Sequence, residues 1–410
     1  MKNHLQENNT FITGINYWPA SKAMYWWHDF APSEVARDFK LIAKHNLKVV
    51  RIFLQWENFQ PYACSISPQA LANLKTTADL AYNIGIQLMP TFFCGHMSGV
   101  NWFPEWLLKH SFISQRFPIY SGGKLLNDTI RNYYTDDEVI KAQMLQIREV
   151  CSALKNHPAI MAYDLGNEPS NCIIPPNREL ARQWLKKMSS CIKNYSDGVP
   201  ITLGMHAEDL EEDRQLWPED AADYCDFLSM HAYPFYLSWA EQPLDANILP
   251  FLGIVTSWLA GKSIPLLMQE FGAPSQPASN PLLRDKKAQL KCPLFSEEEV
   301  CQYYRKSLAL LQNQGFMGAL AWCYSDYAPD LWASPPLRQN IHERYFGLFH
   351  HDNTSKPAAA TWAQLPITPG IEADNNDQSW LQGFYKDEFY VNPQVNLKKM
   401  YSTYQEYLMR

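Results

Sequence analysis

The chain has 410 residues, of which 46% are hydrophobic and 19% charged, as in a globular protein with a large core. Its formal net charge of -7 offers no basic surface for nucleic acid and no polybasic membrane signal, so we expect neither as a partner. The nine cysteines are scattered, odd in number and without short paired spacing, which favours reduced thiols over disulfides or a zinc site.

The first ten residues are polar and lack the apolar segment and small-residue cleavage site of a secretory signal. No later stretch is apolar enough to span a bilayer. We therefore expect a cytoplasmic protein. The sequence leaves the oligomeric state open.

Along the chain, eight strand-like apolar runs alternate with helical patterns. The expected strands are 11–16, 49–54, 86–92, 160–165, 201–203, 227–230, 265–268 and 318–322. Such alternation closes most simply into a parallel (β/α)8 barrel of the α/β class, and a doubly wound open sheet is the alternative. We expect residues 1–410 to form a single barrel domain, with 366–410 a C-terminal extension that packs on it.

Helical periodicity is clear in two segments. Residues 33–45 place Val35, Phe39 and Ile42 on one face, and 135–155 place Ile140, Met144, Ile147 and Leu154 inward. Capping boxes predict helix starts at Thr135 with Glu138 and at Ser296 with Glu299, the second helix stopping at Gly315. The polar stretch 368–378 is expected to be a mobile excursion before a final helix, 393–408.

Three long segments follow expected strand ends: 94–134, 273–295 and 325–346. They are rich in aromatic residues, Pro, Asn and Ser, whereas a structureless linker is rich in Gly, Ser and charge. We expect these loops to build a deep, aromatic-walled site on one face of the barrel.

Two of the strand-like runs end in a glutamate, Glu168 before Pro169 and Glu270 before Phe271-Gly272. A glutamate after a strand is usually a solvated loop residue or a helix-start partner, so either motif alone is weak. The C-terminal face of a parallel barrel, however, collects such side chains. Paired carboxylates at that face suggest cleavage of a glycosidic bond.

Other polar or aromatic residues fall at expected strand ends: Arg51, His231, Tyr233 and Trp322. Singly, Arg51 could be an ordinary ion-pair partner, His231 a satisfied buried histidine and Trp322 a core residue. Their joint placement at strand ends favours a sugar-binding site.

With these residues in place, the sequence resembles the clan A glycoside hydrolases, in particular family 5 and its bacterial mannosidase and mannanase-like branches. The resemblance covers about residues 10–365. It is carried by the segments 14–19 (GINYWP), 50–53 (VRIF), 95–99 (GHMSG), 166–169 (GNEP), 231–234 (HAYP), 269–272 (QEFG) and 321–322 (AW), with 347–349 and 356–357 resembling the closing segment.

The resemblance implies a role for each matching position. Glu168 would be the general acid/base and Glu270 the nucleophile. The residues expected to bind substrate or orient the pair are Asn167 at the sugar 2-hydroxyl, Arg51 and Tyr233 at Glu270, His231 beside Glu168, Trp322 as the floor of the central subsite, and His96 and Asn16 as further substrate contacts.

The chemistry places physical demands on this pair. A retaining mechanism needs carboxyl groups about 5 to 5.5 Å apart. We expect Arg51 to favour the ionised form of Glu270, while burial and the neighbouring carboxylate hold the proton on Glu168. No metal or organic cofactor is required.

The predicted function is therefore retaining hydrolysis of β-linked oligosaccharides, with mannosidic or glucosidic linkages left undecided. Because the loops 102–134 and 324–345 are long enough to wall off one end of the cleft, we favour an exo-acting β-mannosidase. The alternatives are an endo-β-1,4-mannanase or cellulase-type enzyme and a non-catalytic carbohydrate-binding barrel. A metal-dependent hydrolase would need clustered His and Asp ligands, and only scattered His are seen.

Overall fold

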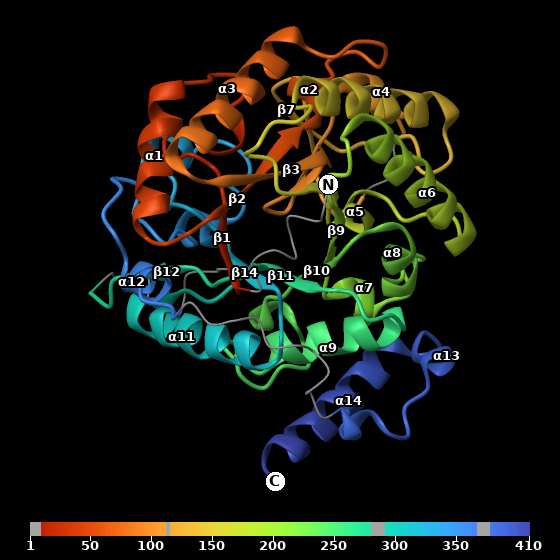
Figure 1. The fold of residues 1–410 in the computed structure, drawn as a ribbon, viewed down its shortest axis with the longest axis vertical. Helices are drawn as coiled ribbons and strands as arrows, with labels where there is room; N and C mark the ends of the chain where they lie inside the picture. The colour runs from red at the N-terminus through yellow and green to blue at the C-terminus, as the bar shows by residue number, and fades with distance from the viewer. Residues whose placement is uncertain (1–9, 112–114, 280–291, 367–377) are drawn as a thin grey trace.

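The computed structural model describes residues 10–111, 115–279, 292–366 and 378–410. Eight parallel strands close into a barrel in the order β1-β14-β11-β10-β9-β8-β3-β2, with helices outside it (Figure 1). The barrel strands are β1 Ile12–Asn16, β2 Val49–Gln55, β3 Gln87–Cys94, β8 Tyr163–Asn167, β9 Ile201–His206, β10 Leu228–His231, β11 Leu266–Phe271 and β14 Gly318–Ala321. The (β/α)8 prediction is confirmed.

The helices follow the strands in the order that a barrel requires. They are α1 Pro32–Lys44, α2 Trp56–Phe59, α3 Pro68–Ile84, α4 Asp137–Ala153, α5 Pro169–Cys172, α6 Arg178–Tyr195, α7 Glu208–Glu211, α8 Pro218–Tyr224, α9 Ile248–Ala260, α11 Glu297–Asn313, α12 Pro357–Ala363, α13 Lys386–Phe389 and α14 Pro393–Leu408.

Helix starts follow local side-chain chemistry. The capping box of Ser296 and Glu299 forms as predicted at α11. The one expected at Thr135 is wrong, because the N-cap of α4 is Asp136, whose carboxylate accepts from the amides of Glu138 and Val139. Met144, expected to face inward on α4, is 38% exposed. The expected excursion at 368–378 lies outside the described residues except for its last position.

The barrel interior is built in layers because every second residue of a strand points inward. The lower layer is apolar and contains Val49, Met89, Ala162, Phe227 and Leu267. Two residues further along the chain from each of these, the position is polar and fully buried: Arg51, Thr91, Asp164, Ser229 and Gln269. A polar layer therefore lies directly below the C-terminal face of the barrel.

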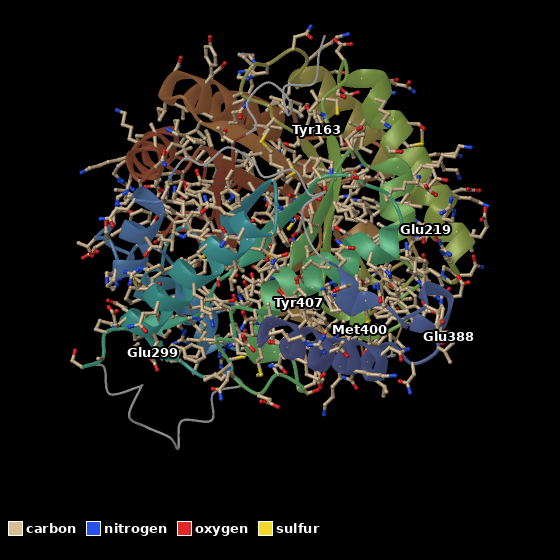
Figure 2. The ribbon with its side chains drawn as sticks, turned by 60° about the horizontal axis from the view of Figure 1, so that its bottom comes forward. Tyr163, Glu219, Glu299, Glu388, Met400 and Tyr407 are labelled. Carbon is tan, nitrogen blue, oxygen red and sulfur yellow. The ribbon has the colours of Figure 1, made fainter. Side chains whose placement is uncertain are left out.

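The C-terminal helix α14 lies outside the ring of barrel helices, near α9 and α7 (Figure 1). Helix α9 is apolar on almost all sides, so it needs cover on its outer face as well as its inner one. Its Phe251 packs against Tyr401 and Tyr404 of α14, with ring centroids 4.8 and 5.6 Å apart. Figure 2 views this end of the molecule, with Met400 of α14 labelled.

The long segment after β3 carries short strands of its own. β4 His96–Met97, β5 Val100–Trp102, β6 Ile119–Ser121 and β7 Lys124–Leu126 form a four-stranded sheet, and β12 Ser275–Gln276 pairs with β13 Phe295–Ser296 after β11. No helix among the described residues is both long and apolar enough to cross a bilayer.

Candidate active site

Glu168 and Glu270 come together at the C-terminal face of the barrel. Glu168 directly follows β8 and has a left-handed backbone, with φ 46°, which costs a non-glycine residue free energy. Glu270 lies within β11. One oxygen of each carboxylate and a ring nitrogen of His231 lie within 4.8 Å of one another. This proximity is what two carboxylates acting on one glycosidic bond require.

Arg51 is fully buried and anchors Glu270 from below. Its Nη1 donates to Glu270 Oε1, and its Nε and Nη2 donate to Asp164 Oδ2 at 3.0 and 2.7 Å. Nη2 also donates to Asn167 Oδ1 at 2.8 Å, while the amide of Asn167 donates to the His96 carbonyl. The guanidinium thus orients both Glu270 and Asn167, the residue that precedes Glu168.

Asn16 lies behind this layer and does not line the active-site cavity, and neither does Arg51. The Asn16 amide donates to the carbonyls of Gln269 and Ala321, and its oxygen accepts from Arg51 Nη1 at 3.1 Å. The side chain therefore ties β1 to β11 and β14 and orients Arg51. In this position it supports the site from below.

His231 and Tyr233 contact the two glutamates from the end of β10. His231 Nδ1 lies 2.9 Å from Glu168 Oε1 and 3.5 Å from Glu270 Oε2. The Tyr233 hydroxyl donates to Glu270 Oε2 at 2.9 Å. His96 is more distant, with its Nε2 3.9 Å from Glu168 Oε2 and its Nδ1 2.8 Å from Asn101 Oδ1.

The charges around the two carboxylates are arranged unequally. Burial alone would raise the pKa of Glu168, but the positive charges of His206 and His231 outweigh burial and lower it. Burial raises the pKa of Glu270, and His231 and Arg51 oppose that rise only in part. The expected placement of the resting proton on Glu168 is therefore not what these surrounding charges favour. A proton on His231 Nδ1 can reach Glu168 along their 2.9 Å hydrogen bond.

Two acidic residues that the sequence did not single out complete this network. Asp164 accepts from Arg51, from Thr91 Oγ1 at 2.8 Å and from the Gly204 amide at 3.0 Å. Asp209 lies 3.0 Å from His206 Nδ1, and together with Glu168 it raises the pKa of His206 to about 10 against the effect of burial. The signal for Asp164 was a charged residue inside an apolar strand.

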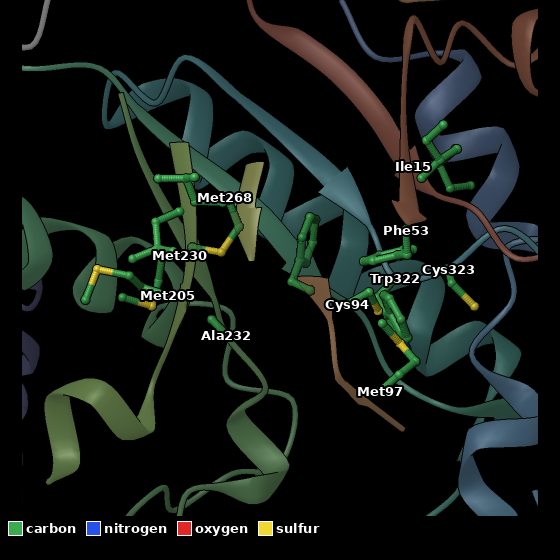
Figure 3. Packing of buried hydrophobic residues seen from close by; sticks show 14 of the residues in the cluster. Ile15, Phe53, Cys94, Met97, Met205, Met230, Ala232, Met268, Trp322 and Cys323 are labelled. Atoms are coloured by element: carbon green, nitrogen blue, oxygen red, sulfur yellow. The ribbon is translucent and has the colours of Figure 1, made fainter. Parts of the chain in front are cut away.

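A cavity of about 480 Å³ opens above the glutamates. Its lining includes Asn167, Glu168, His231, Tyr233, Glu270 and Trp322, together with His96 from the loop after β3. Trp322 packs edge-on against Phe53, and Figure 3 shows the two side chains next to each other. Their ring centroids are 6.0 Å apart. Seven predicted site residues thus share one cavity.

The cavity wall joins loops that are far apart in the sequence. Ser98, in the loop after β3, donates through its hydroxyl to Glu343 Oε2 at 2.9 Å, and its carbonyl accepts from Asn340 Nδ2 at 2.7 Å. We call these three residues the latch. On another side, Arg116 pairs with Glu208 of α7 at 2.5 Å. The loop after β3 is therefore joined to the loop after β14 on one side and to α7 on the other.

Glu168, His231 and Glu270 form the one group among the described residues whose spacing could hold a metal ion. The group already has a buried cation, since Arg51 Nη1 contacts Glu270. Both His231 nitrogens are also engaged, Nδ1 at Glu168 and Nε2 at Gln269 Oε1, 2.8 Å away. These contacts suit a carboxylate pair better than a metal centre.

A (β/α)8 barrel with two facing carboxylates at its C-terminal face is the architecture of a retaining-type glycosidase. The family model "Cellulase (glycosyl hydrolase family 5)" matches residues 5–326. The chain belongs to this family, which confirms the predicted membership.

Solved structures share the fold. GH5_18 from Streptomyces cattleya in complex with GlcNAc is 20% identical with a TM-score of 0.73, and the match covers 96% of this chain and 93% of that one. A substituted form of the same protein, in complex with Manb1-4GlcNAc, is 21% identical with a TM-score of 0.72, covering 88% and 83%. The exo-beta-1,4-mannosidase Op5Man5 from Opitutaceae bacterium strain TAV5 is 23% identical with a TM-score of 0.69, covering 86% and 58%.

Among curated proteins, the beta-glucuronidase of Mus musculus is 23% identical over 228 residues. The match covers 54% of this chain and 31% of that protein, so the chain spans about a third of the length of this relative.

Proposed function

We propose that this protein is a retaining exo-β-glycosidase that removes a terminal β-mannose from small oligosaccharides. The observation that carries the reaction type is the approach of the Glu168 and Glu270 oxygens to within 4.8 Å. That spacing suits direct attack by one carboxylate and is shorter than the separation of about 6.5 to 9.5 Å by which an inverting enzyme makes room for the attacking water.

In the proposed reaction, a Glu270 oxygen attacks the anomeric carbon while the Glu168 carboxyl gives its proton to the departing glycosidic oxygen. Glu168, now ionised, then takes a proton from water. The water oxygen attacks the same carbon, and the bond to Glu270 breaks to regenerate the carboxylate. Arg51 and Tyr233 hold Glu270 for the first step, and the Glu168–His231 hydrogen bond supplies the proton.

The latch supports exo action. It connects the loop after β3 to the loop after β14 across the cavity wall, through two hydrogen bonds of 2.9 and 2.7 Å. A wall in that position limits the number of sugar units on one side of the glutamates. The names of the structural neighbours, an exo-beta-1,4-mannosidase and a complex with Manb1-4GlcNAc, support mannose as the sugar.

Product analysis tests this proposal. Wild-type protein is incubated with aryl β-mannoside, β-glucoside and β-galactoside and then with a β-1,4-manno-oligosaccharide series, with Glu270→Ala as the inactive control. We expect fastest turnover of the mannoside and a monosaccharide as the sole early product. An early spread of di- and trisaccharides indicates an endo enzyme, and no turnover of any glycoside indicates a binding protein.

A further inference from the structure

The hydrogen bonds behind His231 fix which of its nitrogens carries a proton. Gln269 is fully buried, and its Oε1 lies 2.8 Å from His231 Nε2. The Gln269 amide nitrogen faces Asp164 Oδ2 at 3.3 Å and Met89 Sδ at 3.2 Å. The other amide orientation would set the Gln269 oxygen against the carboxylate of Asp164, two acceptors facing each other.

Asp164 is held in its acceptor role by its own partners. Arg51 and Thr91 donate to its Oδ2, and the amides of Gly166 and Gly204 donate to its Oδ1 at 3.3 and 3.0 Å. The Gln269 oxygen must therefore point to His231, and His231 Nε2 must be the donor. In a neutral ring, Nδ1 is then a bare acceptor.

We propose that Gln269 is a positioning residue that fixes this protonation pattern and so keeps one proton in the hydrogen bond between His231 and Glu168. With Nε2 occupied, that bond exists either as imidazolium with carboxylate or as neutral imidazole with carboxylic acid. Both forms hold the proton needed by the leaving group. The opposite ring tautomer would donate from Nδ1 to an ionised Glu168 and leave it no proton to give.

This inference rests on the proposed function, because it assigns Gln269 a part in acid catalysis by Glu168. The packing supports it independently. A Cβ atom added at Gly204 would lie 2.9 Å from Gln269 Oε1 and 3.0 Å from Arg51 Nη2. The glycine on β9 therefore leaves the space that the Gln269 amide occupies.

Several other groups face the Glu168–His231 pair: His96 on β4, Arg116 in the loop after β3, Asn171 on α5, His206 on β9, Tyr233 after β10 and Glu270 on β11. Among the described residues, none of these groups is hydrogen-bonded to the Gln269 side chain, whose partners are His231, Asp164 and Met89, and of these three only His231 is hydrogen-bonded to Glu168. A change in the pH profile of a Gln269 variant therefore reports the contact between Gln269 and His231.

The test compares Gln269→Met, which keeps the volume but removes the oxygen acceptor, with Gln269→Glu, which keeps the acceptor and adds negative charge. For Gln269→Met we expect kcat/KM on an oligosaccharide to fall about 100-fold, and kcat/KM on a 2,4-dinitrophenyl glycoside to fall by less than about 10-fold, because the activated leaving group needs little protonation. In Gln269→Met, the protonated His231–Glu168 pair loses the hydrogen bond at His231 Nε2. The basic limb of the pH profile of kcat/KM should therefore move about one pH unit lower.

Gln269→Glu should move the same limb upward, because the added charge favours the protonated pair. The matched control is Gln146→Met on α4, which changes a buried glutamine remote from the site. It should leave kcat/KM on both substrates and the basic limb of the pH profile unchanged. Equal losses on both substrates, or an unmoved limb in both Gln269 variants, would show that Gln269 is merely structural. Wild-type protein without glycosidase activity would instead overturn the proposed function itself.

Discussion

Arg51→Lys tests how far the site depends on a single guanidinium. Arg51 makes six hydrogen-bond contacts with its five N–H groups: the single Nε hydrogen is shared between Thr91 and Asp164, Nη1 donates to Asn16 and Glu270, and Nη2 donates to Asp164 and Asn167. A lysine ammonium has three donors on one nitrogen and cannot span both buried carboxylates.

The expected loss follows from that difference. At least three bonds disappear, and at about 1 kcal/mol each the free energy of unfolding should fall by about 3 kcal/mol, within the range for disrupting a buried ion pair. A weakened hold on the Glu270 carboxylate should lower kcat by about 10- to 100-fold.

Urea unfolding followed by circular dichroism measures the first effect, and turnover of an aryl glycoside measures the second. Arg37→Lys on α1 is the matched control, since the Arg37 side chain is 61% exposed and its ion pairs should contribute little. A stability change in Arg51→Lys below about 1 kcal/mol, with kcat within threefold of wild type, would refute this view of the polar layer.

Further substitutions probe other parts of the account. Glu168→Ala should lose most activity on oligosaccharides while sparing activated aryl glycosides, and azide should restore turnover with a β-glycosyl azide as product; absence of rescue argues against the acid/base role. Asn340→Ala leaves the Ser98 carbonyl of the latch without its donor, so amide hydrogen exchange at 96–102 should accelerate about 5- to 30-fold, and unchanged exchange would mean that the latch does not hold the loop. Gln146→Met removes a buried amide whose nitrogen and oxygen have no hydrogen-bond partner among the described residues, so stability should rise by up to about 1 kcal/mol; a clear loss of stability would show that the amide is hydrogen-bonded in the folded protein.

The strands could be predicted from the sequence because their interior runs are apolar, but their ends could not. The strand predicted at 201–203 continues to His206, and the one predicted at 265–268 continues to Phe271. Polar residues such as His206 and Gln269 end an apolar run, yet they remain in the strand because the barrel ladder continues through them. The polar residues of the site therefore end the apolar pattern before the strand itself ends, which makes the strand ends hard to predict.

Site residues could be predicted where each belongs to a recognisable local sequence motif, as Glu168 and Glu270 do. Asp164, Gln269 and the latch were missed because their roles depend on partners distant in the chain, such as His231 for Gln269, 38 residues away, and Thr91 for Asp164, 73 residues away. The four-stranded sheet after β3 was also missed, since its strands are only two or three residues long and carry no periodic pattern.

The reaction type depends on the short distance between the Glu168 and Glu270 carboxylates. The most direct measurement is proton NMR of the sugar released in the first minutes of hydrolysis of an aryl β-mannoside, before mutarotation mixes the anomers. Double displacement predicts that the β-anomer forms first. The α-anomer as the first product would contradict the assignment of Glu270 as nucleophile and, with it, the retaining mechanism.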